Sequence, residues 1–269
     1  MRSVRFATLD AGQIRDFWAS QAAEHGSSHR ASWSDRGAIE LEIGAIGSRL
    51  QPGSDVLDVG CANGFSSRRY VEDRGITLTG VDFVPEMIEA AEESLSDTPA
   101  ALRQRVRFVV GDVRALDFPS ASFDAVISTR VIINLATDEE QRTALGECTR
   151  VLRPGGLFLL SEAIRQGWQR LNSLRTQWGL DAIPMPDFNR YLDEDQVRAT
   201  LQPVATLEET VDFASSYYVA TRFLKPLLVK ATNAAVDVAD PEAEFNRWAA
   251  KLPPAGDYGT QKLLVFRKR

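Results

Sequence analysis

The sequence has little that could bind a metal or build a disulfide framework. Its 269 residues include only two cysteines and two histidines. The cysteines, Cys61 and Cys148, lack the spacing of zinc ligands and are too few to hold a chain of this size together. We therefore expect no metal site. The scarcity of cysteine favours a reducing, cytoplasmic setting, in which both side chains serve as small apolar groups.

Nor does the chain carry an excess of positive charge or a long apolar run. Lysine and arginine number 31 against 37 acids, so the formal net charge is −6. A dominant basic surface for nucleic acid or an anionic membrane is therefore not expected. No uncharged apolar stretch of about 18 residues is present, and the first residues lack the apolar core of a signal peptide. The expected partner is a small molecule, and a homo-oligomer is left open.

What the sequence does have is the composition of an ordinary globular protein. Hydrophobic residues make up 44% and charged residues 25%, as is typical of that class. The length suits one large α/β domain with a core of its own. No internal repeat or low-complexity tract interrupts it, so a single domain over residues 1–269 is expected.

Apolar residues recur at helical spacing in the first fifty residues. Ile14 and Phe17 fall on one face of the first segment, and Ile39 and Ile43 on one face of the second. This spacing predicts a helical cap over residues 1–50.

Strands and helices alternate in the next part of the chain, residues 51–162. Helices are expected from Phe65, after Pro85, and over residues 138–152, where Pro154 ends the helix. The alternation is typical of a parallel sheet with helices on both faces. Short apolar runs predict strands at 56–60, 76–83, 106–113, 123–129 and 156–162.

The pattern changes after Glu162. Residues 163–203 and 214–260 are expected to be largely helical insertions, the first of them interrupted by prolines. Residues 204–213 and 261–269 alternate like two further strands.

Three acids mark the ends of the first three predicted strands, namely Asp58, Asp82 and Asp112. Ligands of open α/β sheets bind at these strand ends, where the first strand–helix loop comes closest. In that loop Gly60 and Gly64 depart from the G-x-G-x-x-G spacing of a pyrophosphate cradle. Acids without a basic clamp favour a nucleoside that carries positive charge.

Five motifs in this order, VLDVGCANG, GVDF, GDV, FDAVIST and RVLRPGG, resemble those of the class I S-adenosylmethionine-dependent methyltransferases. The resemblance covers about residues 51–162 and the two late strands. It implies a Rossmann-like seven-stranded sheet whose last strand is antiparallel, with S-adenosyl-L-methionine as cofactor. More loosely, TRVIINL and the segments after Glu162 resemble a bacterial subgroup that acts on small hydrophilic acceptors such as sugars.

The resemblance also implies which residues bind the cofactor. The Gly60–Gly64 loop would hold the methionine part, Asp82 the ribose hydroxyls, and Asp112 with Val113 the adenine. Ala62 departs from the family, many of whose members have glycine there. The complete expected set is Asp58, Gly60, Cys61, Ala62, Gly64, Asp82, Phe83, Asp112, Val113 and Thr129.

Methyl transfer to a hydroxyl also requires a base. Glu162, at the end of the fifth predicted strand, and His29, in the cap, are the catalytic candidates. Histidine has the more suitable unperturbed pKa, whereas Glu162 has the better predicted position. A structural hydrogen bond is the alternative role for Glu162, and helix capping or plain exposure for His29.

Polar residues after the fourth strand and in the first insertion are candidates for binding the acceptor. Local ion pairs and hydrogen bonds are their alternative role. Trp18, Trp33, Tyr217 and Tyr218 are expected in the core or the cap, with pocket lining as the alternative. The acceptor candidates are Arg130, Asn134, Asn172, Arg175, Asn189 and Tyr191.

The expected activity is therefore O-methylation of a small polar metabolite, with a sugar favoured. Methylation at nitrogen or carbon of a small natural product stays open, as does a cofactor-binding module without activity, because a fold does not fix a function. A cavity bordered by Arg130, Glu162 and His29 would favour the enzyme, and side chains filling that space would favour the module.

Overall fold

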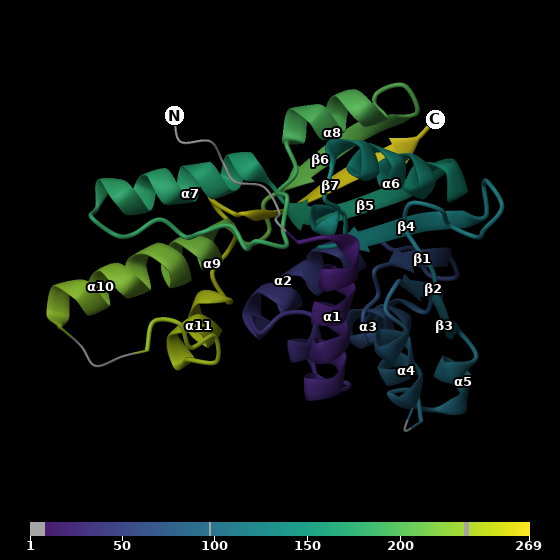
Figure 1. Cartoon of the computed structure of the whole chain (residues 1–269), viewed down its shortest axis with the longest axis horizontal. Coiled ribbons are helices and arrows are strands. Elements are labelled where there is room, and N and C mark those ends of the chain that lie inside the picture. The colour runs from purple at the N-terminus through teal and green to yellow at the C-terminus, as the bar shows by residue number, and fades with distance from the viewer. Residues whose placement is uncertain (1–8, 97, 234–236) are drawn as a thin grey trace.

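The computed structural model describes residues 9–96, 98–233 and 237–269, and a seven-stranded sheet lies at its centre (Figure 1). The strand order is β3-β2-β1-β4-β5-β7-β6. Strand β7 is antiparallel to both of its neighbours, while the other pairs are parallel. The predicted fold class is confirmed. The strands are β1 (Asp55–Val59), β2 (Thr77–Asp82), β3 (Val106–Val110), β4 (Phe123–Thr129), β5 (Leu152–Ala163), β6 (Ala205–Val211) and β7 (Gln261–Lys268).

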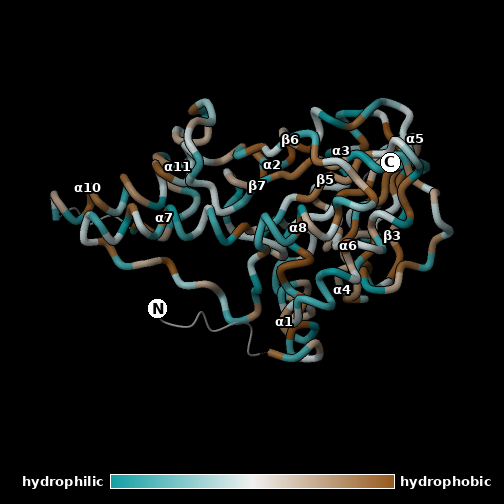
Figure 2. Tube along the Cα trace, turned by 90° about the horizontal axis from the view of Figure 1, so that it is seen from above, coloured by the Kyte–Doolittle hydropathy of each residue, from teal (hydrophilic) through white to brown (hydrophobic). Residues whose placement is uncertain are grey.

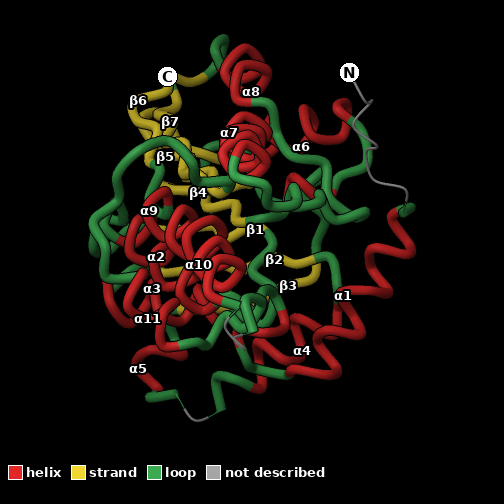
Figure 3. The backbone as a smooth tube through the Cα atoms, turned by 90° about the vertical axis from the view of Figure 1, so that its left-hand side faces the viewer, coloured by secondary structure: helices red, strands yellow, loops and turns green. Residues whose placement is uncertain are grey.

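Helices cover both faces of the sheet because neighbouring side chains of a strand point to opposite faces. Val56 belongs to the same core cluster as Ile39 and Tyr70, on one face. Its neighbour Leu57 belongs to a second cluster with Leu145, on the other. Figure 3 shows the strands between these two layers. The helices of the layers are α2 (Arg36–Gly47), α3 (Phe65–Arg74) and α4 (Pro85–Glu93) on one face, and α6 (Asp138–Val151) and α8 (Glu194–Leu201) on the other.

The first fifty residues do more than cap the sheet. Helix α1 (Ala11–His25) starts at a capping box formed by Asp10 and Gln13 and packs beside α4. A short 3₁₀ turn, η1 (His29–Ala31), then leads into α2. The apolar residues of α2 lie in the main core, so this helix is a full member of one layer.

Two of the helices after β5 extend beyond one end of the sheet (Figure 1). Helix α7 (Arg165–Gln177) and helix α10 (Lys225–Thr232) run alongside each other at one end of the molecule (Figures 1 and 2). Helix α9 (Ser215–Val219) passes through a π-helical turn, Ala220–Leu224, directly into α10. Two short helices complete the α-helices of the described residues, α5 (Ala100–Arg103), which the sequence did not indicate, and α11 (Glu244–Ala249). A second 3₁₀ turn, η2 (Ile132–Asn134), follows β4.

Within the residues that the structure describes, no helix is long and apolar enough to cross a membrane. The same residues contain no group of three or more side chains arranged to hold a metal ion.

Candidate active site

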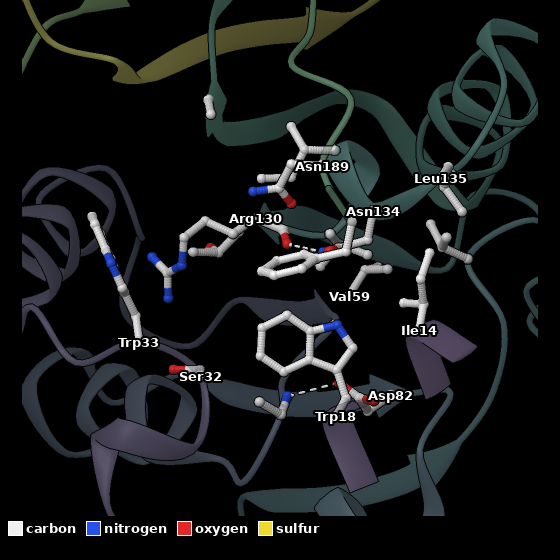
Figure 4. A pocket seen from close by; sticks show the side chains of 18 of the residues that line it. Ile14, Trp18, Ser32, Trp33, Val59, Asp82, Arg130, Asn134, Leu135 and Asn189 are labelled. Atoms are coloured by element: carbon white, nitrogen blue, oxygen red, sulfur yellow. Dashed lines mark hydrogen bonds between the residues drawn. The ribbon is translucent and has the colours of Figure 1, made fainter. Parts of the chain in front are cut away.

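A cavity of about 680 Å³ lies at the carboxyl ends of the parallel strands (Figure 4). Its floor is the loop after β1, and its walls come from α1, the turn after β4 and residues 183–191. This is where open α/β sheets bind ligands, and the volume is that of a small-molecule site.

Many of the predicted site residues meet in this cavity. Trp18, Trp33 and Tyr218 line it as well, whereas Tyr217 does not. The predicted residues that line it are Asp58, Gly60, Cys61, Ala62, Asp82, Phe83, Asp112, Val113, Thr129, Arg130, Asn134, Asn189 and Tyr191. Those that do not line it are Gly64, Glu162, His29, Asn172 and Arg175.

Glycine is required at Gly60 for two reasons. Its φ of +71° lies in the left-handed region, which costs other residues roughly 1–2 kcal/mol. In addition, a Cβ on Gly60 would lie 1.8 Å from Cγ2 of Val131. The loop after β1 and the turn after β4 therefore touch at this glycine, and both line the cavity there.

Gly64 has a different task from the predicted one. Its φ is also +71°, but a Cβ there would lie 2.5 Å from Cζ of Phe108 in β3. Gly64 therefore permits α3 to begin close against the sheet. It faces the core rather than the cavity.

Asp58 and Asp82 are buried carboxyl groups that line the cavity. Burial raises the pKa of Asp58 to about 7, opposed by a hydrogen bond from the Ser67 hydroxyl. Burial likewise raises the pKa of Asp82 to about 6, opposed by the N–H groups of Val84 and Ala62, which both donate to it. The two groups are therefore poised to change charge near neutral pH.

Asp112 is held by an arginine that the sequence did not single out. Arg114 donates to both oxygens of Asp112 and also pairs with Glu140 at 2.5 Å. Partial burial would raise the pKa of Asp112, but the Arg114 guanidinium holds it below its usual range. The sequence was read as having no basic group beside the strand-end acids, and that interpretation is wrong at this strand.

Glu162 does not fit the predicted role of a base facing the acceptor. It is fully buried, and its carboxylate accepts hydrogen bonds from the Ser128 hydroxyl and from the N–H groups of residues 131–133. Burial raises its pKa to about 7, opposed by these donors. Because the oxygens are used by the chain itself, Glu162 fixes the turn after β4.

His29 also lies outside the cavity lining. Its ring packs beside Phe65, and its Nε2 is buried, without a hydrogen bond, 3.7 Å from Glu242. Burial lowers the pKa of His29, although Glu242 opposes this. This position does not support its predicted role as a base, because its buried nitrogen does not line the cavity.

Two predicted acceptor residues instead support the loop that forms one wall. Asn172 uses both ends of its amide on the backbone of Ile183, donating at 3.0 Å and accepting at 2.7 Å. Arg175 donates to the backbone oxygens of Asp181 and Arg222. Neither side chain lines the cavity, so their predicted role in binding the acceptor is not supported.

Arg130 lines the cavity, but its positive charge is neutralised by a buried carboxylate. It pairs with Glu42, which is only 1% exposed, and its guanidinium lies 4.9 Å from the centre of the Trp33 ring. The carboxylate of Glu42 also accepts hydrogen bonds from Ser161 and Gln261. Glu42 was missed, although an acid within the apolar stripe of its helix was a readable signal.

Arg222 also lines the cavity, and no local sequence pattern indicates it. It lies in the π-helical turn, pairs with buried Asp35 at 2.6 Å and covers the ring of Tyr218 at 4.0 Å. Asp35 also accepts a hydrogen bond from the Tyr217 hydroxyl. The pairing joins segments almost 190 residues apart, and no local pattern in the sequence reports it.

Comparison with known proteins identifies the part of the chain that surrounds the cavity floor. Residues 56–156 match the profile of a family described as a methyltransferase domain. They form a class I S-adenosylmethionine-dependent methyltransferase domain. This confirms the resemblance carried by the five sequence motifs, and S-adenosylmethionine is the cofactor of that family.

Curated methyltransferases match part of the chain. The chain is 34% identical over 113 residues to 2-methyl-6-phytyl-1,4-hydroquinone methyltransferase of Synechocystis, covering 42% of this chain and 33% of that protein. It is 31% identical over 144 residues to demethylmenaquinone methyltransferase of Renibacterium salmoninarum, covering 54% and 55%. The chain thus spans between about a third and just over half of these relatives.

Solved structures share the fold of this protein over nearly the whole chain. Magnesium protoporphyrin IX methyltransferase from Synechocystis, solved with bound S-adenosylhomocysteine, has a TM-score of 0.64 at 15% identity, covering 97% of this chain and 100% of its own. The [4+2]-cyclase SpnF has a TM-score of 0.63 at 21% identity, covering 98% of each chain. At these identities the likeness concerns the fold alone.

Proposed function

We propose that this protein transfers a methyl group from S-adenosylmethionine to a small molecule. The observation that carries the proposal is the extent of the cavity. It begins at the predicted cofactor residues Asp82 and Val113 and continues past Gly60 to Asn134 and Tyr218. We call the part of the cavity at Asp82 and Val113 the first, or cofactor, compartment, and the part at Asn134 and Tyr218 the second, or acceptor, compartment. A module that only bound the cofactor would not need the second compartment.

The residues of the first compartment suit the cofactor. Asp82 offers a buried carboxylate to hydroxyl donors, while Phe83, Met87 and Val113 offer apolar surface to a ring. Buried acids without an unpaired arginine also suit a ligand that carries positive charge. We therefore assign ribose contacts to Asp82 and adenine contacts to Phe83 and Val113.

The chemistry asks the protein mainly to position the two reactants. When bound, S-adenosylmethionine supplies a methyl group on a positively charged sulfur. The acceptor atom forms a bond to the methyl carbon, the carbon–sulfur bond breaks, and the sulfur keeps the electron pair. The turn at residues 130–134 and the wall at residues 183–191 orient the acceptor. Because neither histidine lines the cavity, we propose that a hydroxyl acceptor loses its proton to solvent.

A hydroxyl remains the accepting group that we propose, and a sugar remains a prediction. The matched relatives are named for hydroquinone, demethylmenaquinone and arsenite methylation, so they do not select an acceptor. The single test of the activity is binding and turnover. Purified protein should be stabilised against heat by S-adenosylhomocysteine and should convert S-adenosylmethionine to it when small-molecule extract is added. Stabilisation without turnover in any extract would leave the binding module as the better description.

Affinity for S-adenosylhomocysteine should rise with pH. The raised pKa values of Asp58 and Asp82, about 7 and about 6, mean that both groups hold protons in the free protein at pH 5. A ligand that donates hydrogen bonds to these carboxylates must displace the protons, so affinity should increase up to about pH 8 and then level off. Calorimetry at several pH values in buffers of different ionisation enthalpy would also detect the released protons.

Asp82→Ala should weaken S-adenosylhomocysteine binding by about 1.5–3 kcal/mol, the range for hydrogen bonds to a charged group. The pH dependence assigned to Asp82 should flatten in the same variant. Asp73→Ala, at an exposed site on α3, is the matched control and should bind normally. Unchanged affinity in Asp82→Ala would remove this residue from the ribose site.

A further inference from the structure

The arginines that line the cavity are neutralised by the protein itself. Each of the three lining arginines has a carboxylate partner: Arg114 pairs with Asp112, Arg130 with Glu42, and Arg222 with Asp35. An anionic acceptor would have to compete with a partner already in place. The arginines therefore offer it little net attraction.

The lining acids likewise have partners within the described residues. Glu140 is bound to Arg114, and Asp10 accepts the N–H of Gln13. Asp58 and Asp82 accept the hydrogen bonds described above and belong to the cofactor compartment. The second compartment thus presents no carboxylate that lacks a partner to a cationic acceptor.

Two polar atoms break this pattern of complete pairing. Oδ1 of Asn134 and Oδ1 of Asn189 are buried without a hydrogen-bond partner, and both residues line the cavity. Asn189 as a whole is 9% exposed. The orientation of Asn134 is fixed, since its Nδ2 donates to the carbonyl of Arg130 at 2.7 Å and leaves the oxygen as the free end. Buried acceptors without donors cost free energy unless a ligand supplies them.

The two amides are held next to each other by the backbone. The N–H of Arg190 donates to the carbonyl of Ile133 at 2.6 Å, which joins the residues that follow Asn189 and precede Asn134. Gln141 donates to the carbonyls of Ile132 and Arg190 and ties the same two segments together. Figure 4 shows Asn189 and Asn134 on the same side of the cavity, across from Trp18.

The remaining surface of this compartment is largely aromatic and apolar. Trp18 and Phe188 approach each other edge to face at 5.8 Å, and Trp168 and Tyr191 do so at 6.0 Å. Leu135 and the prolines Pro184 and Pro186 also line the cavity. Such walls suit a molecule with flat apolar faces.

We propose that the acceptor is an uncharged, ring-containing molecule whose hydroxyl or N–H groups donate hydrogen bonds to the side-chain oxygens of Asn134 and Asn189. The proposal rests on the proposed function, because it names the substrate class of the same cavity. The two asparagines act as specificity-determining residues. They select donors by accepting from them, while the paired arginines give no advantage to an anion.

The test uses the whole protein saturated with S-adenosylhomocysteine and three matched probes. 4-Hydroxybenzamide is neutral and carries donors, N,N-dimethyl-4-methoxybenzamide is neutral and has none, and 4-hydroxybenzoate is an anion. Dissociation constants from ligand-observed NMR should show 4-hydroxybenzamide binding about tenfold more tightly than either other probe. Asn189→Leu should reduce the preference for 4-hydroxybenzamide over N,N-dimethyl-4-methoxybenzamide and leave the affinity for S-adenosylhomocysteine unchanged.

Gln202→Leu is the matched control, because it makes the same kind of change at an exposed position after α8, outside the cavity lining. It should keep the preference. Equal or tighter binding of 4-hydroxybenzoate, no binding of 4-hydroxybenzamide at millimolar concentration, or an undiminished preference over N,N-dimethyl-4-methoxybenzamide in Asn189→Leu would each overturn the proposal. Failure of S-adenosylhomocysteine itself to bind would instead overturn the proposed function.

Discussion

Gly60→Val should abolish measurable binding of S-adenosylhomocysteine, with a loss of at least about a hundredfold in affinity, or about 2.7 kcal/mol. The backbone of the new valine must keep a φ of +71°, which is unfavourable for this residue type. Its side chain must also occupy space already filled by Val131. Either the loop after β1 or the turn after β4 has to move. Both line the cavity, so the cofactor compartment cannot keep its shape. Calorimetry measures the affinity directly.

Gly146→Ala is the matched control for this substitution, because a Cβ there meets nothing within 4 Å. It lies within α6, where alanine favours the helix, so binding should be unchanged and stability slightly higher. Combining Gly60→Ala with Val131→Ala should restore part of the affinity that Gly60→Ala loses, since the clash is relieved while the backbone strain stays. Normal binding by Gly60→Val would place the cofactor elsewhere.

The fold could be predicted from the sequence because its signals are local. Apolar runs such as residues 56–60 identify buried strands, and Thr137 with Glu140 forms a capping box at the start of α6. Boundaries were less accurate. Strand β5 begins at Leu152 rather than at residue 156, because Phe123 of β4 pairs with Leu152 beyond an irregularity in the ladder. The first residue of such a strand therefore depends on its pairing with a neighbouring strand.

The part of the cavity that we propose for the cofactor could be predicted for a related reason. Asp82 and the Gly60 loop are fixed by their places at strand ends, so their position follows from the strand pattern. The acceptor compartment depends on contacts between distant segments. Asn172 and Asn189 looked alike as polar residues of one insertion, but the first is consumed by the backbone of Ile183 and the second is not.

Glu162 shows the limit most clearly. Its place at the end of a strand was predicted correctly, yet its chemistry depends on where the turn after β4 directs its N–H groups. These converge on the carboxylate because Arg130 adopts a φ of +57°, which turns the chain sharply. A left-handed arginine cannot be foreseen from residue type, because side chains other than glycine seldom adopt this conformation.

Glu162→Ala should lower the free energy of unfolding by about 3–5 kcal/mol, because it leaves several buried donors without an acceptor. Val131 belongs to the turn that is released and also contacts Gly60, so affinity for S-adenosylhomocysteine should fall together with stability. Chemical denaturation and calorimetry on the same samples measure the two quantities. Glu140→Ala, at a carboxylate bound by Arg114 at the edge of the cavity, is a milder comparison, since its side chain is partly exposed.

Glu162→Gln distinguishes a positioning role of Glu162 from a role as a base. Because the folded-state pKa of Glu162 is raised to about 7, the folded protein holds a proton that the unfolded chain has lost, and stability should fall as pH rises from about 4.5 to 7. Glutamine removes this contribution, so the variant should show a shallower decline over that range together with reduced cofactor affinity. If Glu162 were a base, Glu162→Gln would instead abolish turnover while the affinity for S-adenosylhomocysteine matched that of the unsubstituted protein.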